Sequence, residues 1–171
     1  MSPVLKPGAI DFISHSEDQT RRLGARLGRL VQAGQVIALL GALGSGKTRL
    51  VQGFGAGLGV PADEVINSPT FTFINEYRGR LPCYHIDLYR LTAPAEAETL
   101  GLDDLLYGDG VCIIEWADRL GDRLPAERLE ITFHYLDETK RRLVMRAYGE
   151  EYSTLLKTFK ETAFQGSVLT D

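Results

Sequence analysis

Cysteine is scarce in this chain, which has Cys83 and Cys112 and no others among its 171 residues. No Cys-x-x-Cys motif or Cys/His pair indicates a zinc site. Each cysteine lies among apolar, β-branched or aromatic neighbours, a setting typical of buried free thiols in strands. A chain of this length can bury a full hydrophobic core without disulfides or a structural metal.

Long apolar runs are absent as well. The longest run spans residues 36–43 and is far too short to cross a bilayer. The first ten residues lack the basic-then-apolar pattern of a signal peptide. A net charge of −4 argues against a protein whose main task is to coat nucleic acid, although a local basic patch is compatible with it. We therefore expect a cytoplasmic protein with reduced cysteines and no membrane association.

The chain length fits one domain. We expect residues 1–160 to form that domain and residues 161–171 to form a flexible tail. Apolar and alternating patterns predict strands at residues 10–13, 36–40, 71–77, 82–87, 111–115, 129–135 and 142–147. Helices are predicted from a capping box at 14–17 or 16–19 to about 33, at 48–58, 94–100 and 103–107, and from about 150. This order predicts an α/β domain with a mixed sheet.

The stretch GALGSGKT at residues 41–48 matches the Walker A pattern in full, after an apolar strand and before a helix. Glycines let the backbone N–H groups turn towards one anion, and the helix that follows adds the positive end of its dipole. The lysine supplies a charge for the β- and γ-phosphates, and the threonine hydroxyl is a hard oxygen ligand for Mg²⁺. The predicted phosphate-binding residues are Gly41, Ala42, Leu43, Gly44, Ser45, Gly46, Lys47 and Thr48.

Such a loop needs a carboxylate on the metal side, and two strands end in one. Glu115 follows four apolar residues, the Walker B pattern with Glu in place of Asp, and Asp87 ends a less apolar strand. Because ligands gather at the carboxyl ends of parallel strands, both acids are candidates, with an N-cap or surface role as the alternative. The chain lacks the Asn-Lys-x-Asp motif that reads guanine, which favours ATP. No Arg-rich lid segment stands out; Arg78 and Arg80 in a predicted hairpin turn are weak support for one.

Four stretches, in this order, carry a family resemblance: GALGSGKT, NSPTFTFINEY (67–77), YHIDLYRL (84–91) and IIEWADRL (113–120). The chain resembles the TsaE family, the bacterial ATPases of tRNA threonylcarbamoyladenosine synthesis, over about residues 11–147. The resemblance implies a P-loop NTPase-like three-layer fold with parallel central strands flanked by antiparallel strands. It also implies binding to the TsaB–TsaD complex, with TsaC in the same pathway, and ATP hydrolysis that resets that complex.

The resemblance implies roles for individual residues. Thr48, Glu115 and Asp87 match the magnesium side of the family's site, with Asp87 also near the attacking water. Thr70, in the Ser-Pro-Thr of a switch-like loop, would sense the γ-phosphate, and a plain turn is the alternative. Glu17 matches a contact on the base side of the nucleotide, although it is also the acid of one capping-box register. For Trp116 a role in activity and a place in the core stay open.

Three further features have more than one interpretation. His85 is interpreted as a satisfied core histidine. The arginines of the first predicted helix, Arg21, Arg22, Arg26 and Arg29, form either a solvated face or a surface for an acidic partner or tRNA phosphate. The loop at residues 60–70 offers little to anchor it to a core, so we expect it to move until nucleotide and a partner order it. Two other functions stay open: a P-loop kinase for a small molecule or protein, and a nucleotide-gated binding module.

Overall fold

The protein is described by a computed structural model, which covers residues 8–69 and 72–163. Seven strands form one sheet in the order β1-β7-β6-β2-β5-β4-β3. The strands are β1 (Ala9–Ser14), β2 (Val36–Leu40), β3 (Ile74–Arg78), β4 (Pro82–Asp87), β5 (Val111–Glu115), β6 (Arg128–Tyr135) and β7 (Arg141–Tyr148). The helices are α1 (Glu17–Leu30), α2 (Lys47–Gly57), α3 (Glu96–Thr99), α4 (Leu102–Leu106), η1 (Ala117–Arg123) and α5 (Glu150–Ala163).

The centre of the sheet is parallel and its margins are antiparallel. Strand β2 runs parallel to β5 and β6, and β4 runs parallel to β5. The outer pairs β1/β7, β6/β7 and β3/β4 are antiparallel. This arrangement confirms the predicted mixed sheet, with parallel central strands flanked by antiparallel strands.

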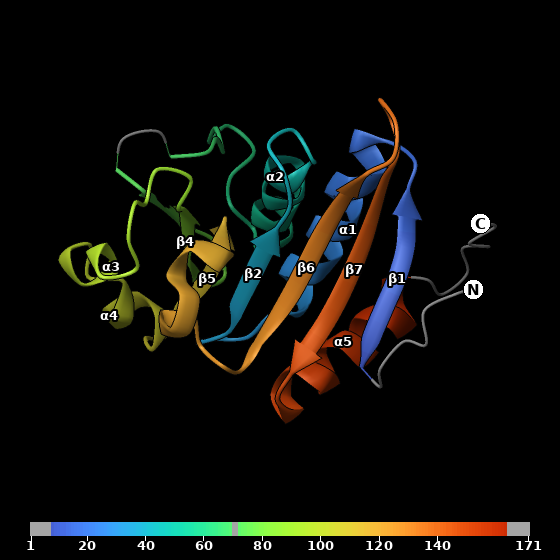
Figure 1. Cartoon of the computed structure of the whole chain (residues 1–171). Coiled ribbons are helices and arrows are strands. Elements are labelled where there is room, and N and C mark those ends of the chain that lie inside the picture. The colour runs from blue at the N-terminus through green and yellow to red at the C-terminus, as the bar shows by residue number, and fades with distance from the viewer. Residues whose placement is uncertain (1–7, 70–71, 164–171) are drawn as a thin grey trace.

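Two hydrophobic cores cover the two faces of the sheet, so the fold has three layers. In β2, Ile37 and Leu39 join a core with α1, α2 and α5, while Val36 and Ala38 join a second core with α3, α4 and η1. Figure 1 shows α1, α2 and α5 on one side of the sheet and α3 and α4 towards its other margin. A central strand covered on both sides reads as a continuous apolar run, which is why VIALL was recognisable as a strand.

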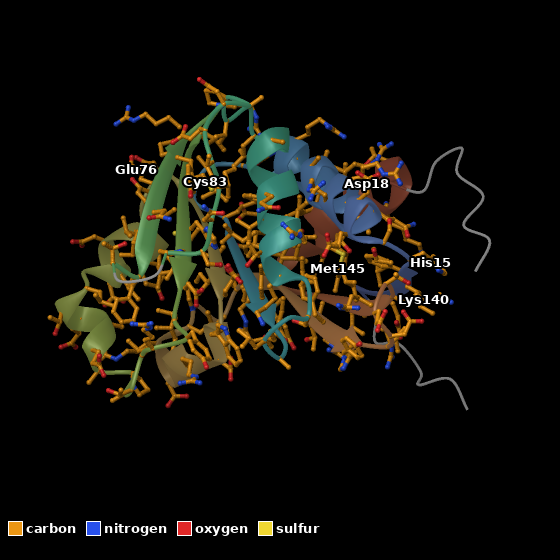
Figure 2. The ribbon with its side chains drawn as sticks, turned by 90° about the horizontal axis from the view of Figure 1, so that it is seen from above. His15, Asp18, Glu76, Cys83, Lys140 and Met145 are labelled. Atoms are coloured by element: carbon orange, nitrogen blue, oxygen red, sulfur yellow. The ribbon has the colours of Figure 1, made fainter. Side chains whose placement is uncertain are left out.

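Helix α1 begins by the second of the two predicted capping registers. The Ser16 hydroxyl accepts a hydrogen bond from the Gln19 backbone N–H at 3.0 Å, and the Gln19 side chain accepts one from the His15 backbone N–H. Glu17 therefore occupies the first turn of the helix and is free of the capping role that the other register would give it. His15 and Asp18 mark this end of α1 in Figure 2.

Helices α1 and α2 pack against each other through glycines. A Cβ on Gly24 or Gly28 of α1 would overlap the carbonyl oxygens of Leu50 or Phe54 in α2. A Cβ on Gly53 of α2 would likewise overlap a carbonyl oxygen of α1. We call these residues, with Gly57, the glycine seam. It brings the two backbones into direct contact, and Figure 2 shows the two helices side by side.

The end of α1 is capped by the β3–β4 turn. Arg80 donates from Nη2 to the carbonyl oxygens of Gly28 and Val31, each at 2.9 Å. A cation at a helix C-terminus satisfies carbonyl groups that lack an intrahelical partner and interacts favourably with the dipole. Arg80 is therefore committed to the fold, and the weak support that it gave for a lid is withdrawn.

Strand β3 is shorter than predicted, because it begins at Ile74 instead of residue 71. Phe73 has a φ of 64°, a left-handed conformation that interrupts an extended strand. Its carbonyl oxygen accepts a hydrogen bond from the Asp87 backbone N–H at 2.8 Å. Of the expected tail at residues 161–171, positions 164–171 lie outside the described residues, and α5 continues to Ala163. Within the described ranges, no helix is long and apolar enough to span a membrane.

Candidate nucleotide-binding site

The candidate site lies at the carboxyl ends of the central parallel strands. Asp87 of β4 and Glu115 of β5 are register partners on adjacent strands, and Leu39 of β2 is opposite Glu115 on the other side. The Walker A loop leaves β2 at this same edge and leads into α2. The two acids and the loop, which are far apart in the sequence, therefore meet where ligands bind in open α/β sheets.

The loop takes its shape from glycines in conformations that other residues avoid. Gly44 has a φ of 77° and Gly46 a φ of 104°, and α2 begins immediately afterwards at Lys47. Within the described chain, no side chain caps the start of α2 at Gly46. The N–H groups of the first helical turn, together with the helix dipole, therefore face the loop, an arrangement that suits an anion.

Lys47 is buried at the mouth of the loop, with 4% of its surface exposed. Its Nζ donates to the carbonyl oxygens of Gly41 at 2.5 Å and Ala42 at 2.9 Å, and it lies 4.4 Å from the centre of the Trp116 ring. Burial lowers the pKa of Lys47, against the opposing effect of the Glu115 and Asp87 charges. The ammonium group is thus held inside the loop by the loop's own carbonyl groups.

Glu115 is the centre of a hydrogen-bonded group. Its Oε1 accepts from the Thr48 hydroxyl at 3.1 Å, and its Oε2 accepts from the Ser68 hydroxyl at 3.1 Å. His85 Nε2 lies 2.6 Å from Oε2. Burial alone would raise the pKa of Glu115, but the hydrogen bonds and charge of His85 and the hydroxyls of Ser68 and Thr48 outweigh it and lower the pKa. Glu115 is therefore ionised at neutral pH despite being 3% exposed.

Asp87 lines the same cleft and has a different environment. Its Oδ1 accepts a hydrogen bond from the Tyr89 backbone N–H at 3.0 Å. Burial raises the pKa of Asp87, and the neighbouring Glu115 charge adds to this, while the hydrogen bond from Tyr89 opposes it. Two carboxylates at one site therefore have pKa values shifted in opposite directions, a pattern common where charges are arranged for chemistry.

A cleft of about 420 Å³ joins these residues. Glu17 lines it from the first turn of α1 and lies 3.3 Å from the Nε of Arg49, which belongs to α2. Thr70 lies outside the described residues, so its predicted place at the γ-phosphate stays a prediction. The cleft is lined by Glu17, Leu43, Gly44, Ser45, Gly46, Lys47, Thr48, Arg49, Gln52, Asn67, Ser68, Asp87, Tyr89, Glu115 and Trp116.

Sequence reasoning missed Arg49, Gln52, Asn67 and Tyr89 as cleft residues. Gln52 has a usable signal, because it follows Thr48 by four positions and therefore shares its face of α2. Trp116 has a φ of 59°, and this left-handed turn directly after Glu115 brings the indole beside Lys47. The indole also packs against the Tyr89 ring at 5.2 Å between centroids. Trp116 is therefore a wall of the cleft.

The loop that precedes β3 has anchors that the sequence did not suggest. Gln52 donates from Nε2 to the Ile66 carbonyl oxygen at 3.1 Å, and the Asn75 side chain donates to the Asn67 carbonyl oxygen at 3.2 Å. The Ile66 side chain lies where a Cβ on Gly55 would stand, and it packs against the core. The expectation that little in this loop can anchor to a core is therefore wrong for residues 66–68, because α2 and β3 provide the partners.

The chemistry of these groups fits a nucleotide with a divalent cation. The glycine conformations shape a cradle for phosphate, and Thr48 and Glu115 bring two hard oxygen donors together. The described residues contain no group of three His, Cys, Asp or Glu side chains that could hold a metal. Mg²⁺ is usually bound by one or two carboxylates together with substrate phosphates and water, and such a site needs no dedicated cage.

Comparison with known proteins agrees with this geometry. The family model described as "Threonylcarbamoyl adenosine biosynthesis protein TsaE" matches residues 14–143, most of the chain. The chain belongs to the TsaE family. That match contains the Walker A loop, both acids and Trp116, so the whole candidate site lies inside it.

Individual relatives cover most of the chain. The tRNA threonylcarbamoyladenosine biosynthesis protein TsaE of Bacillus subtilis is 40% identical over 139 residues, which are 81% of this chain and 85% of that protein. The protein of the same name from Treponema pallidum is 41% identical over 133 residues, or 78% of this chain and 97% of that protein. The crystal structure of Bacillus subtilis YdiB aligns with a TM-score of 0.78 at 32% identity, covering 94% of this chain and 98% of that one. The TsaE family resemblance drawn from the sequence motifs is confirmed.

Proposed function

We propose that the chain is a Mg²⁺-dependent ATPase that acts in the formation of threonylcarbamoyladenosine on tRNA, at the adenosine next to the anticodon. The observation that carries the proposal is the meeting of Lys47, Thr48, Glu115 and Asp87 in one cleft at the carboxyl ends of parallel strands. Family membership supplies the pathway, since the relatives are named for threonylcarbamoyladenosine biosynthesis.

Each residue has a stated part in this proposal. The backbone N–H groups of Gly41 to Thr48 hold the phosphates, and Lys47 exchanges its loop carbonyl partners for β- and γ-phosphate oxygens. Thr48 and Glu115 hold Mg²⁺, which would neutralise charge on the transferred phosphoryl group. Asp87, next to Glu115, orients the attacking water. Glu17 contacts the base side of the nucleotide, and Thr70 senses the γ-phosphate.

We further propose that a complex of TsaB and TsaD is the partner, with TsaC acting in the same pathway and tRNA contacted indirectly or weakly. The segment at residues 66–68 is hydrogen-bonded to Thr48 and Glu115 through Ser68, so the nucleotide and this loop compete for the same groups. Nucleotide binding would therefore reposition the loop, and a partner that prefers one loop arrangement would by linkage prefer one nucleotide state.

ATP turnover measured by chromatography of ADP tests this function. We expect slow hydrolysis by the protein alone and faster hydrolysis with TsaB–TsaD. Transfer of phosphate to an added hydroxyl substrate, with water hydrolysis unaffected by TsaB–TsaD, would instead identify a kinase. Of the two arginines that gave weak support for a lid, Arg80 caps α1, so the ATPase is the better-supported candidate.

Variants of the acids separate binding from hydrolysis. Glu115→Gln and Asp87→Asn remove a charge with little change of shape, so the hydrolysis rate should fall about 100-fold, the scale of losing one placed electrostatic group. ATP affinity should fall less. Lys47→Ala should weaken ATP binding itself while leaving the melting temperature without ligand close to the wild-type value. Unchanged hydrolysis in either acid variant would remove that acid from the proposed site.

A further inference from the structure

The side chain of His85 is fully buried in β4 and lies directly behind the candidate metal-binding groups. Its Nε2 is 2.6 Å from Glu115 Oε2, and within the part of the chain that the structure describes Nδ1 has no hydrogen-bond partner. The sequence alone suggested a satisfied core histidine. The structure instead pairs one ring nitrogen with the site and leaves the other without a partner.

The unpartnered Nδ1 bears on the question of why a histidine occupies this position. A buried polar atom without a hydrogen-bond partner carries a desolvation cost that packing does not offset. An ionised carboxylate can only accept a hydrogen bond, so Nε2 carries a proton and donates it to Glu115 Oε2. An apolar side chain could fill this space without leaving any polar atom unpaired, so packing alone does not account for a histidine here.

The consequence lies in the orientation of the carboxylate. Rotation of the Glu115 carboxylate about its last bond is limited by the short bond from His85 to Oε2, so the other oxygen, Oε1, stays directed at the Thr48 hydroxyl 3.1 Å away. Residues behind a metal ligand fix its orientation in this way, and their loss typically weakens metal binding about 10–100-fold.

We propose that His85 is a positioning residue which holds the Glu115 carboxylate so that Oε1 and the Thr48 hydroxyl together receive the cation of the nucleotide complex. The inference rests on the proposed function, because it requires that Thr48 and Glu115 bind Mg²⁺ with ATP. It gives β4 a second contribution to the site besides Asp87, from two positions earlier on the same face of the strand.

The test measures how the affinity for a nucleotide depends on Mg²⁺, without relying on ATP hydrolysis. Binding of a non-hydrolysable ATP analogue is titrated by calorimetry over a range of Mg²⁺ concentrations for wild type, His85→Leu, His85→Asn and His85→Gln. Leucine fills the space without a donor, and the short asparagine amide does not reach Oε2. The glutamine amide nitrogen extends to about the position of Nε2. Cys83→Ala, a buried change two residues earlier in β4 whose register partner on β5 is Val111 and not Glu115, is the matched control.

We expect the Mg²⁺ concentration for half-maximal tightening of analogue binding to rise about 10–100-fold in the leucine and asparagine variants. Glutamine should restore most of the wild-type value, and Cys83→Ala should match wild type. Analogue binding without Mg²⁺ should be the same in all variants that fold. If the leucine variant does not fold, the difference between asparagine and glutamine still decides the question.

Two results would overturn the inference in different ways. Equal Mg²⁺ dependence in wild type and the asparagine and leucine variants, with only lower melting temperatures, would show that His85 is a core residue and leave the proposed function intact. If the wild type binds the analogue with an affinity that does not change with Mg²⁺ concentration, both the proposed metal site and the role of His85 are wrong.

Discussion

The glycines of the Walker A loop lie in the sequence between the α1 and α2 glycines of the glycine seam, and the two sets are required for different reasons. Gly44 has a φ of 77° with no other heavy atom within 4 Å of the place where a Cβ would stand. Gly53 has an ordinary helical backbone, but its Cβ would overlap the Arg21 carbonyl oxygen. At Gly44 glycine is required by the backbone torsion angle φ, and at Gly53 it is required because there is no space for a Cβ.

The difference matters for what each region does. Loop glycines form part of the surface that a ligand contacts, so replacing one of them affects the shape of the loop itself. Seam glycines bring α1 to within backbone contact of α2, and this places Glu17 beside Arg49 at the edge of the cleft. The seam therefore sets the distance between the two sides of the site without lining it.

The largest effect should come from Gly53→Ala. Overlap with a backbone oxygen cannot be relieved by a side-chain rotation, so the helices must separate. Overpacking of this kind costs about 1–3 kcal/mol and sometimes more, and we expect the upper end of that range. Urea unfolding followed by circular dichroism gives the free energy of unfolding. An unchanged midpoint would mean that α1 and α2 are farther apart than the structure has them.

Gly44→Ala should have a smaller effect, divided between stability and binding. A non-glycine residue in the left-handed region costs about 1–2 kcal/mol. If the loop keeps its shape, that cost appears in the free energy of unfolding. If the loop relaxes, it appears as weaker binding of an ATP analogue, by about tenfold for 1.4 kcal/mol. Unfolding and titration on the same variant measure both parts, and a wild-type result in both would contradict the left-handed conformation.

Gly55→Ala should change stability least and is the matched control for Gly53→Ala in the same helix. The atom in its way is the end of the flexible Ile66 side chain, and alanine is better than glycine in a helix by up to about 1 kcal/mol. The net change in stability should therefore stay below about 1 kcal/mol. Displaced Ile66 should loosen the loop, which limited proteolysis between residues 61 and 69 would detect as faster cleavage. Cleavage at the wild-type rate would mean that Ile66 is not an anchor of this loop.

Much of the fold could be predicted because its signals are local. The runs VIALL and VCIIE are each covered on both faces, and both strands begin and end at the predicted residues. The Walker A pattern, with its strand and helix, placed the loop and the start of α2 in the same way. Because each parallel strand here ends at the same edge of the sheet, Asp87 and Glu115 could be expected to meet before any coordinates were known.

Most of the features that were missed depend on residues that are distant from one another in the sequence. Arg80 caps a helix that ends about fifty positions earlier, and nothing near Arg80 distinguishes a capping arginine from a solvated one. His85 reaches Glu115 because their strands are adjacent, a relation that the apolar pattern of neither strand encodes. The left-handed Phe73, which shortens β3, contradicts the alternating pattern of FTFINEY and has no local signal.

The position of β1 at the edge of the sheet has a consequence for synthesis of the protein. Its neighbour is β7, with Ala9 opposite Arg146, so the first strand to leave the ribosome stays unpaired until the last strand has been synthesised. At about 5–20 residues per second that wait is on the order of ten seconds. During this time an unpaired strand can join another chain, which makes nascent or prematurely ended copies prone to aggregate. We expect products truncated before β7 to be held by chaperones or degraded, while the full-length chain closes its own sheet as translation ends.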